Sequence, residues 1–216
     1  MLFAIDNPHI YRYIEEHISH LPGDEMLCEI ERFTYWNTVN SRMLSGKIQA
    51  RILQFFCNIK RPKKILEIGT FTGYSAIAMA NVIDEDATIY SLDTNDEYLE
   101  IAKRFVDKAN LSKKIKLVNS DVKPFVDNNP LLFDFIFIDG EKDEYIHYFE
   151  TSLPYLAEDG IILADNTLWS GKILDDNATD KKTKHLREFN KMVSNDTRIK
   201  SFILPVRDGL TIIMKK

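Results

Sequence analysis

The sequence predicts an α/β protein built on a mostly parallel sheet with helices on both faces. Short apolar runs that read as strands alternate with helical patterns from Lys64 onward, and such alternation is typical of βαβ units. No strand is evident before Lys64. The last two apolar runs are joined by a segment that ends in Asp208-Gly209, which predicts a final antiparallel hairpin.

Helical periodicity fills the N-terminal region. Apolar residues recur at helical spacing from about residue 7 to residue 60. The last of these amphipathic helices is expected over Gly46–Asn58, where Pro62 stops it. We interpret residues 1–60 as a helical extension and residues 61–216 as the α/β core of a single domain, because 216 residues suffice to bury one core.

The predicted strands are short and number seven. Helices are expected between them, including Asn95–Ala109 and Glu144–Leu156. The polar stretch Gly171–Lys184 is interpreted as a mobile surface loop or lid. The strands cover Lys64–Ile68, Thr88–Asp93, Ile115–Asn119, Phe133–Asp139, Gly160–Asp165, Lys200–Leu204 and Leu210–Met214.

The composition is that of an ordinary globular protein, with 44% hydrophobic and 28% charged residues. The formal net charge of −5 gives no overall attraction to nucleic acid. Asp6 interrupts the first apolar run and no basic residue precedes it, so no signal peptide is expected. No stretch of the sequence is long and apolar enough to predict a membrane span. Cys28 and Cys57 are interpreted as reduced, buried thiols, and the expected location is cytoplasmic.

A glycine-containing loop follows the first predicted strand. The segment LEIGTFTGYS, residues 66–75, runs from a buried strand through Gly69 and Gly73 into a helical run. The glycine spacing differs from that of a dinucleotide site, and no Lys-Ser/Thr follows as in a P-loop. Glu67 would repel a pyrophosphate and suits a cationic ligand. The loop therefore indicates a nucleoside with a positively charged tail, such as S-adenosylmethionine.

An acidic residue ends the second predicted strand. Asp93 stands at the position where a carboxylate typically accepts hydrogen bonds from ribose hydroxyls. The structural alternative is that Asp93 caps the helix expected over Asn95–Ala109.

Two further carboxylates end the fourth and fifth predicted strands. If these strands are neighbours, Asp139 and Asp165 approach each other at one edge of the sheet. Two nearby carboxylates repel unless a cation lies between them, and the Asn166 carbonyl adds a third hard oxygen ligand. This set suits Mg²⁺ better than zinc. Lys142 could reach the same cleft, although a solvated surface lysine is an equal alternative.

These motifs resemble one known family. The chain is similar to the small, cation-dependent O-methyltransferases that use S-adenosylmethionine, the group of caffeoyl-CoA and catechol O-methyltransferases, and it is closest to bacterial members. The resemblance covers nearly the whole chain and implies a Rossmann-like class I methyltransferase fold with seven strands. It rests on LEIGTFTGYS (66–75), FDFIFIDGEKDEY (133–145) and DNTLWSGK (165–172), with weaker matches at RMLSGKIQAR (42–51) and LPVRDGL (204–210).

The resemblance assigns roles to individual residues. Lys142 is expected to be the general base, and Asp139, Asp165 and Asn166 are expected to hold Mg²⁺ or another divalent cation such as Mn²⁺ or Ca²⁺. Met43 and Trp169 are expected beside the substrate. The residues expected to bind S-adenosylmethionine are Glu67, Gly69, Thr70, Phe71, Gly73, Tyr74, Ser75, Asp93, Asp121 and Asp139.

The chain departs from the family pattern at two places. Many relatives carry Ala-Asp where Gly140-Glu141 stands, beside both the expected cofactor and the expected metal. Many also have a Gly-x-Ala or Gly-Ala pair near the adenine, where this chain has Asn119-Ser120-Asp121.

The expected reaction is methyl transfer to one oxygen of a vicinal diol on an aromatic small molecule. Lys142 would accept the proton, provided that Mg²⁺ and partial burial lower its pKa. One alternative acceptor is a tRNA hydroxyuridine, bound by a basic patch drawn from Lys113, Lys114, Lys116, Arg187, Lys191 and Arg198. The other alternative is a non-catalytic S-adenosylmethionine-binding protein. The resemblance also implies a homodimer.

Overall fold

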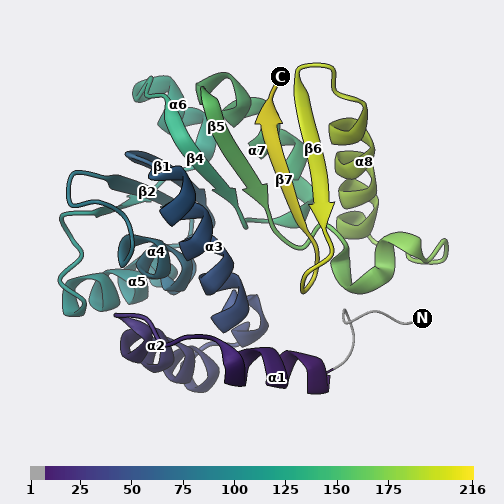
Figure 1. The fold of residues 1–216 in the computed structure, drawn as a ribbon. Helices are drawn as coiled ribbons and strands as arrows, with labels where there is room; N and C mark the ends of the chain where they lie inside the picture. The colour runs from purple at the N-terminus through teal and green to yellow at the C-terminus, as the bar shows by residue number, and fades with distance from the viewer. Residues whose placement is uncertain (1–7) are drawn as a thin grey trace. The chain divides into compact units, whose positions relative to one another are not determined.

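The computed structural model describes residues 8–216 of the chain (Figure 1). Its contacts divide the chain into two compact units. The first unit comprises the chain through Lys64 together with Thr70–Ser120, and the second comprises Ile65–Gly69 and Asp121–Lys216. The strands form a seven-stranded sheet in the order β3-β2-β1-β4-β5-β7-β6, which confirms the predicted fold class. The single-domain interpretation stays a prediction.

The first unit contains the N-terminal helices and one parallel strand pair. β2 and β3 pair in parallel, with Ile89 opposite Ile115 and Asp93 opposite Asn119. The α3 helix ends at Lys60 because Arg61 turns left-handed and Pro62 follows. The elements are α1 (Pro8–His17), α2 (Asp24–Asn37), the 3-10 turn η2 (Ser41–Met43), α3 (Gly46–Lys60), α4 (Tyr74–Ala80), β2 (Thr88–Asp93), α5 (Asp96–Lys108) and β3 (Ile115–Asn119).

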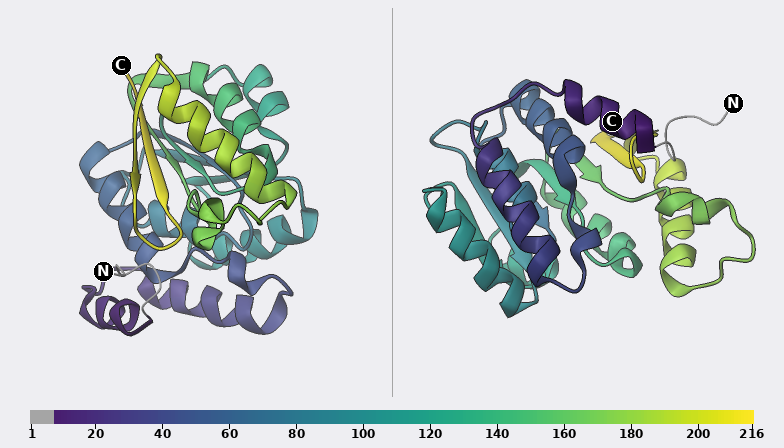
Figure 2. Two further views of the ribbon diagram at one scale, coloured as in Figure 1. Left: turned by 90° about the vertical axis from the view of Figure 1, so that its right-hand side faces the viewer. Right: turned by 90° about the horizontal axis from the view of Figure 1, so that it is seen from below.

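The second unit carries the other strands. Its helices are α6 (Val122–Asn128), α7 (Tyr145–Ser152) and α8 (Lys181–Asn195), and α8 packs beside β6 (Figure 2). Short 3-10 turns cover η3 (Lys142–Glu144), η4 (Leu153–Tyr155) and η5 (Trp169–Leu174). The strands are β1 (Lys64–Ile68), β4 (Phe133–Ile138), β5 (Leu156–Ala164), β6 (Ile199–Leu204) and β7 (Leu210–Lys215).

The parallel strands β1, β4 and β5 set the edge at which polar residues gather. Ile68 lies opposite Ile138, and Ile138 lies opposite Ala164. All residues of β4 from Phe135 to Ile138 are fully buried, as expected for a strand covered on both faces. The residues that follow the three strands, Gly69, Asp139 and Asp165, therefore emerge at one edge, which we call the carboxyl edge.

The C-terminal hairpin brings its turn to the same edge. β7 pairs antiparallel to β5 with Thr211 opposite Ala164, and β6 pairs antiparallel to β7 with Leu204 opposite Leu210. The segment between these strands, Pro205–Gly209, therefore lies where β5 ends. The predicted antiparallel hairpin is confirmed.

Some predicted bounds and burials are wrong. β5 begins at Leu156 rather than Gly160, because α7 ends at Ser152 and Pro154 then prevents the helix from continuing. Cys57 is buried as expected, but Cys28 is exposed on α2. The spacing of apolar residues did not distinguish the two cysteines, because α2 buries only one stripe of its surface.

The expected loop over residues 171–184 is partly ordered into helix. η5 reaches Leu174, and α8 already begins at Lys181, where the Asp180 side chain accepts a hydrogen bond from Thr183 N. The Arg187 guanidinium donates to the backbone carbonyls of four residues in this stretch, Lys172, Ile173, Asp175 and Ala178. The stretch is tied to α8, and its mobility stays a prediction. Among residues 8–216, no helix is long and apolar enough to cross a membrane.

Candidate active site

In the first unit, Asp93 holds the loop Thr70–Gly73. The backbone N–H groups of Thr70 and Phe71 donate to Asp93 Oδ2 at 3.1 and 2.9 Å. Asn95 N donates to Asp93 Oδ1 at 3.0 Å. The Asn95 side chain, rather than Asp93, caps α5, since it accepts from the backbone of Glu97 and Tyr98. The helix-cap alternative for Asp93 is therefore wrong, and Asp93 fixes the loop with two backbone hydrogen bonds.

The loop enters α4 through a tightly packed glycine. Gly73 has a φ of +82°, and a Cβ at this position would lie 3.1 Å from the Ala102 Cβ. Tyr74 and Ser75 follow at the start of α4, and both are buried. The predicted strand, loop and helix are therefore confirmed over this segment.

The predicted substrate residue Met43 lies in η2 and is 45% exposed. Asn40, the residue directly before η2, donates a side-chain hydrogen bond to the Tyr98 hydroxyl at 3.5 Å. The Tyr98 ring meets the Phe71 ring edge-to-face at 4.9 Å between centroids. Contacts through Tyr98 thus connect the turn that carries Met43 to the loop that Asp93 holds.

In the second unit, the carboxyl edge extends the strand ladder to two acids. Asp139 N donates to the Ile68 carbonyl at 2.9 Å, and Asp165 N donates to the Ile138 carbonyl at 3.0 Å. Asp165 is only 3% exposed. Burial raises the pKa of Asp165 to about 7, the charge of Asp139 adds to the shift, and the positive charges of Lys142 and Arg207 oppose it. The two carboxylates are brought together as predicted.

Lys142 belongs to this cluster rather than to the surface. Its Nζ donates to Asp139 Oδ1 at 2.8 Å and to the Tyr145 hydroxyl at 2.9 Å, and its side chain is 12% exposed. Burial alone would lower the pKa of Lys142, but the negative charges of Asp139 and Asp165, with the hydrogen bond to Asp139, outweigh it and raise the pKa. The neighbouring residues therefore favour the ammonium form of Lys142. The expectation that burial lowers the pKa of Lys142 is wrong for the protein without a bound cation.

Tyr145 is a site residue that the sequence analysis missed. It is fully buried, and its hydroxyl donates to the Asp165 carbonyl at 2.9 Å while it accepts from Lys142. Burial raises the pKa of Tyr145, so the phenol keeps its proton. Its position three residues after Lys142, at the start of α7, was the available signal, because side chains at this spacing meet in a helical turn.

Trp169 follows the acids in a strained loop. Asn166 has a φ of +57° and donates its N–H to Asp165 Oδ1 at 2.8 Å. Its carbonyl accepts from Trp169 N at 3.1 Å, and Trp169 itself has a φ of +49°. The indole N–H of Trp169 is buried without a hydrogen-bond partner among residues 8–216. Such a donor is costly to leave unsatisfied, which is consistent with a position that contacts a ligand.

The hairpin turn adds two residues that the sequence analysis did not assign. Leu168 N donates to the Asp208 carbonyl at 2.8 Å, and Ser170 N donates to the Asp208 carboxylate. Burial raises the pKa of Asp208, while the charges of Lys142 and Arg207 oppose that shift. Asp208 and Arg207 therefore lie close to the acidic cluster. No local sequence pattern indicated this proximity.

Two predicted cofactor residues, Glu67 and Gly69, lie in β1 and directly after it. Glu67 in β1 is fully buried. Gly69 has a φ of +105°, and a Cβ there would lie 2.5 Å from the Asp139 carbonyl oxygen, so only glycine fits. A Cβ at Gly140 would lie 2.8 Å from the Tyr148 ring, so a larger residue there would require this ring to move.

Asp121 lies at the start of α6. Its Oδ1 accepts from Val122 N at 2.7 Å, and its Oδ2 lies 3.1 Å from His147 Nε2. Each contact leaves lone pairs on the carboxylate, so the expected cofactor contact is compatible with this position and stays a prediction.

The donor set of the cluster fits a hard divalent cation. Among residues 8–216, no group of three or more His, Cys, Asp or Glu side chains is arranged to hold a metal. The predicted set contains two carboxylates and one amide, Asp139, Asp165 and Asn166, all oxygen donors of the kind that Mg²⁺ and Ca²⁺ prefer. Burial is the main cause of the raised pKa of Asp165, and a cation would offset the added repulsion from Asp139.

The chain as a whole is similar to known proteins. Residues 15–216 match the family described as O-methyltransferase. Caffeoyl-CoA O-methyltransferase 1 of Zea mays is 32% identical over 218 residues, which cover 94% of this chain and 83% of the relative. Caffeoyl-CoA O-methyltransferase 5 of Nicotiana tabacum is also 32% identical, over 94% of this chain and 89% of the relative.

Two crystal structures have the same fold. The SAH-bound methyltransferase PaMTH1 of Podospora anserina gives a TM-score of 0.90 at 26% identity, over 100% of this chain and 99% of that one. The O-methyltransferase of Bacillus cereus in complex with SAH gives a TM-score of 0.86 at 24% identity, over 96% and 97%.

Proposed function

The chain belongs to the O-methyltransferase family, and we propose that it transfers a methyl group from S-adenosylmethionine to a hydroxyl of a catechol-like aromatic small molecule with the help of a divalent cation. The observation that carries this proposal is the buried group at the carboxyl edge of the second unit, where Lys142 Nζ lies 2.8 Å from Asp139 and the Asp165 carboxylate is buried nearby. A non-catalytic binding protein would have no use for this costly arrangement of charges.

S-adenosylmethionine is the proposed methyl donor. SAH-bound PaMTH1 and the caffeoyl-CoA O-methyltransferases, whose family this chain shares, support this choice. Asp93 would bind the ribose, because its carboxylate retains acceptor capacity beyond the backbone hydrogen bonds that it accepts. The other residues proposed to contact the cofactor are Glu67, Gly69, Thr70, Phe71, Gly73, Tyr74, Ser75, Asp121 and Asp139.

Asp139, Asp165 and Asn166 would hold the cation, with Mg²⁺ proposed first and Mn²⁺ or Ca²⁺ as substitutes. When bound, S-adenosylmethionine would supply the electrophilic methyl group, and the cation would lower the pKa of the acceptor hydroxyl. Met43 and Trp169 are proposed to lie beside the acceptor.

Lys142 is the proposed general base. It can accept a proton at Nζ only as a neutral amine, and its raised pKa favours the ammonium. Because the negative charge of Asp139 contributes to that raised pKa, neutralising Asp139 favours the amine. The Tyr145 hydroxyl, 2.9 Å from Nζ, keeps the amine oriented when the ion pair weakens.

The direct test is labelled methyl transfer from S-adenosylmethionine to a panel of catechols and caffeoyl esters, with Mg²⁺ and with a chelator. We expect transfer that requires a vicinal diol and stops with the chelator. Transfer that continues in the chelator would contradict the assignment of Asp139, Asp165 and Asn166. Tight cofactor binding without transfer to any catechol would direct the search to tRNA acceptors.

The tRNA alternative has less support, because several residues of the expected basic patch are engaged within the chain. Lys114 is buried and pairs with Glu85 at 2.9 Å. Arg187 binds backbone carbonyls, and Arg198 pairs with Glu150 and Asp196.

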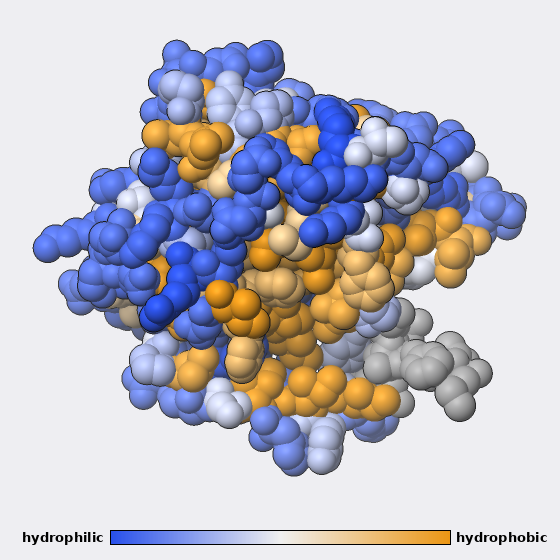
Figure 3. All heavy atoms as spheres, turned by 45° about the horizontal axis from the view of Figure 1, so that its top comes forward, coloured by the Kyte–Doolittle hydropathy of each residue, from blue (hydrophilic) through white to orange (hydrophobic). Residues whose placement is uncertain are grey.

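We also propose a homodimer in the cytoplasm. Apolar side chains of the N-terminal region remain exposed: Trp36 in α2 is 87% exposed, and Val39 in the turn after α2 is 101% exposed. Further hydrophobic residues are visible between hydrophilic ones on the face drawn in Figure 3. Light scattering coupled to gel filtration tests the dimer, and a monomeric mass at all concentrations would contradict it.

A further inference from the structure

Arg207 lies in the hairpin turn at the carboxyl edge. The register of β5 with β7 and of β7 with β6 puts the turn beside the end of β5, as described above. Three hydrogen bonds attach the turn to the loop that carries Trp169, from Thr167 N to the Gly209 carbonyl at 3.1 Å and from Leu168 N and Ser170 N to Asp208. The turn is thereby held against the proposed acceptor side of the site.

The backbone of Arg207 has an unfavourable conformation for its residue type. Its φ is +50°, in the left-handed region that glycine occupies without steric cost. Backbone strain of this kind is frequent at functional sites, where the surrounding structure compensates for it.

The guanidinium of Arg207 contains a buried donor. Its Nη1 atom is buried and has no hydrogen-bond partner within the described part of the chain. Buried donors without a partner are rare and costly. An anion that enters the site would satisfy this donor, because the planar guanidinium binds carboxylate and phosphate groups with paired hydrogen bonds.

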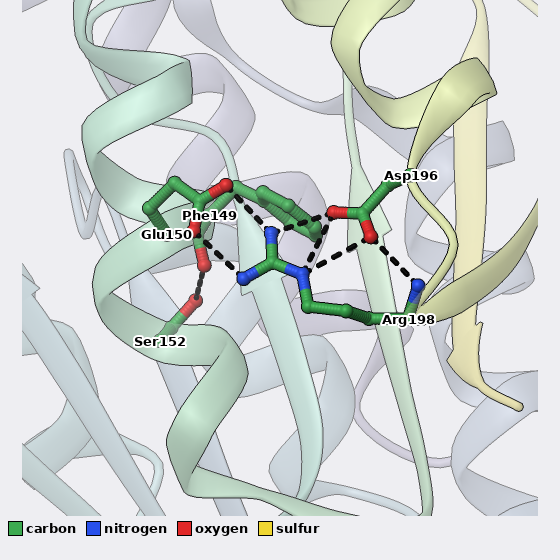
Figure 4. Close-up of polar contacts among 5 residues, drawn as sticks. All are labelled: Phe149, Glu150, Ser152, Asp196 and Arg198. Atoms are coloured by element: carbon green, nitrogen blue, oxygen red, sulfur yellow. Dashed lines mark hydrogen bonds and ion pairs between the residues drawn. The ribbon is translucent and has the colours of Figure 1, made fainter.

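Arg198, directly before β6 in the same unit, is an arginine whose guanidinium is hydrogen-bonded to two carboxylates. Its guanidinium lies between Glu150 and Asp196, with the Phe149 ring 5.9 Å away (Figure 4). It donates to Glu150 at 2.7 and 3.1 Å and to Asp196 at distances from 2.6 to 3.0 Å. Each of its three guanidinium nitrogens donates to a carboxylate, which makes Arg198 the matched control.

We propose that Arg207 determines acceptor specificity by binding an anionic substituent, a carboxylate or a phosphate, on the aromatic diol. This inference rests on the proposed methyl transfer and narrows its substrate class. The structural alternative is that Arg207 serves only to balance the buried charge of Asp165. A charge-balancing arginine would stabilise the fold without distinguishing anionic from neutral acceptors.

The test compares acceptors that differ only in charge. We expect the wild-type enzyme to favour 3,4-dihydroxycinnamate over its neutral amide in kcat/KM by about 10-fold or more, the value of a charge-assisted hydrogen-bonded pair. In Arg207→Gln this ratio should fall to near 1, whereas Arg198→Gln should keep the wild-type ratio. Arg207→Gly, which relieves the positive φ, guards against loss of folding and should also lose the preference. A catechol phosphate monoester, measured beside the carboxylate, shows which anion is preferred.

Binding without turnover separates this inference from the proposed function. 3,4-Dimethoxycinnamate has no free hydroxyl to methylate, and calorimetry should show about 10-fold weaker binding to Arg207→Gln than to wild type. If that difference is found while no catechol is methylated, the proposed reaction fails and the role of Arg207 stands. Equal binding by the two proteins, or an unchanged acceptor ratio in Arg207→Gln, overturns the inference.

Discussion

The arginines at the two ends of the hairpin strand β6 have different surroundings. At its start, Arg198 lies on the surface with hydrogen bonds to Glu150 and Asp196. Past its end, Arg207 lies in a strained turn beside the buried Asp165, with one donor unsatisfied among residues 8–216. The first arrangement satisfies every charge at low desolvation cost, and the second concentrates charges where water is excluded.

This difference separates stabilising charges from functional ones. Ion pairs at the surface contribute modestly to stability and perturb little else. Buried charges cost stability unless they are fully paired, so a cluster that keeps them indicates a use other than folding. Substitutions at the two ends should therefore have opposite consequences for activity and for stability.

The largest effect on activity is expected at Asp165. Asp165→Asn should reduce methyl transfer to the background seen with a chelator, because an amide is a poorer ligand for a hard cation than a carboxylate. Its melting temperature without added metal should be equal to or above that of wild type, because the buried carboxylate, whose pKa burial raises to about 7, is replaced by a neutral group. Calorimetry and the transfer assay measure both quantities. Retained activity, or a large loss of stability, in Asp165→Asn would contradict the claim that this buried carboxylate serves the reaction rather than the fold.

The next effect is expected at Lys142. Lys142→Ala should lower kcat by about 10²–10⁴, the range for loss of an acid–base group. Lys181→Ala is the matched control, because that exposed lysine pairs with Asp143 at 2.6 Å and is assigned no role in the reaction. Near-normal turnover in Lys142→Ala would remove the general-base assignment.

A smaller effect is expected at Tyr145, a positioning residue for Lys142. Tyr145→Phe removes the hydroxyl that contacts Lys142 Nζ and the Asp165 carbonyl, each at 2.9 Å. We expect kcat to fall about 10-fold with KM for both substrates unchanged, consistent with the loss of a hydrogen bond to a charged group. Steady-state kinetics against Tyr35→Phe, an exposed tyrosine, measures the effect. A rise in KM without a fall in kcat would assign Tyr145 to binding instead.

The smallest effect is expected at Arg198. Arg198→Ala should leave methyl transfer unchanged and lower the free energy of unfolding by about 1 kcal/mol or less, because the side chain is 51% exposed. The hydrogen bond to Arg198 lowers the pKa of Asp196 from its ordinary 3.8. Its stabilising contribution is therefore present above pH 3.8 and is lost as the pH falls through the lowered value. The difference in free energy of unfolding between wild type and Arg198→Ala should be smaller at pH 3 than at pH 7, as measured from unfolding curves. An equal difference at the two pH values would contradict this account.

Much of the fold followed from local pattern. The strands β1, β2 and β3 begin and end where the apolar runs predict, and α4 follows the glycine-containing loop as expected. The pairing of Asp139 with Asp165 was predictable too, because the ends of adjacent parallel strands meet at one edge. Several other bounds were misplaced, most of all the start of β5 and the end of α7, which lie on either side of Pro154.

Partners brought from distant parts of the chain were not predictable. His147 contacts Asp121, and Asp143 pairs with Lys181, in each case a partner far away in the chain. Exposure of Cys28 and burial of Lys142 likewise depend on which helix face or turn the tertiary contacts cover.

The sequence by itself determined the order of strands and helices, the position of the loop that Asp93 holds, and the pair of acids at the carboxyl edge. Periodicity and strand ends are local properties, so residues close in the chain encode them. Only the tertiary structure decided that Arg207 and Asp208 join the acids and that Tyr145 links Lys142 to Asp165. These contacts depend on the antiparallel register of β7 against β5, and burial then shifts the pKa of each titratable group. Register and burial both arise only when distant segments pack together.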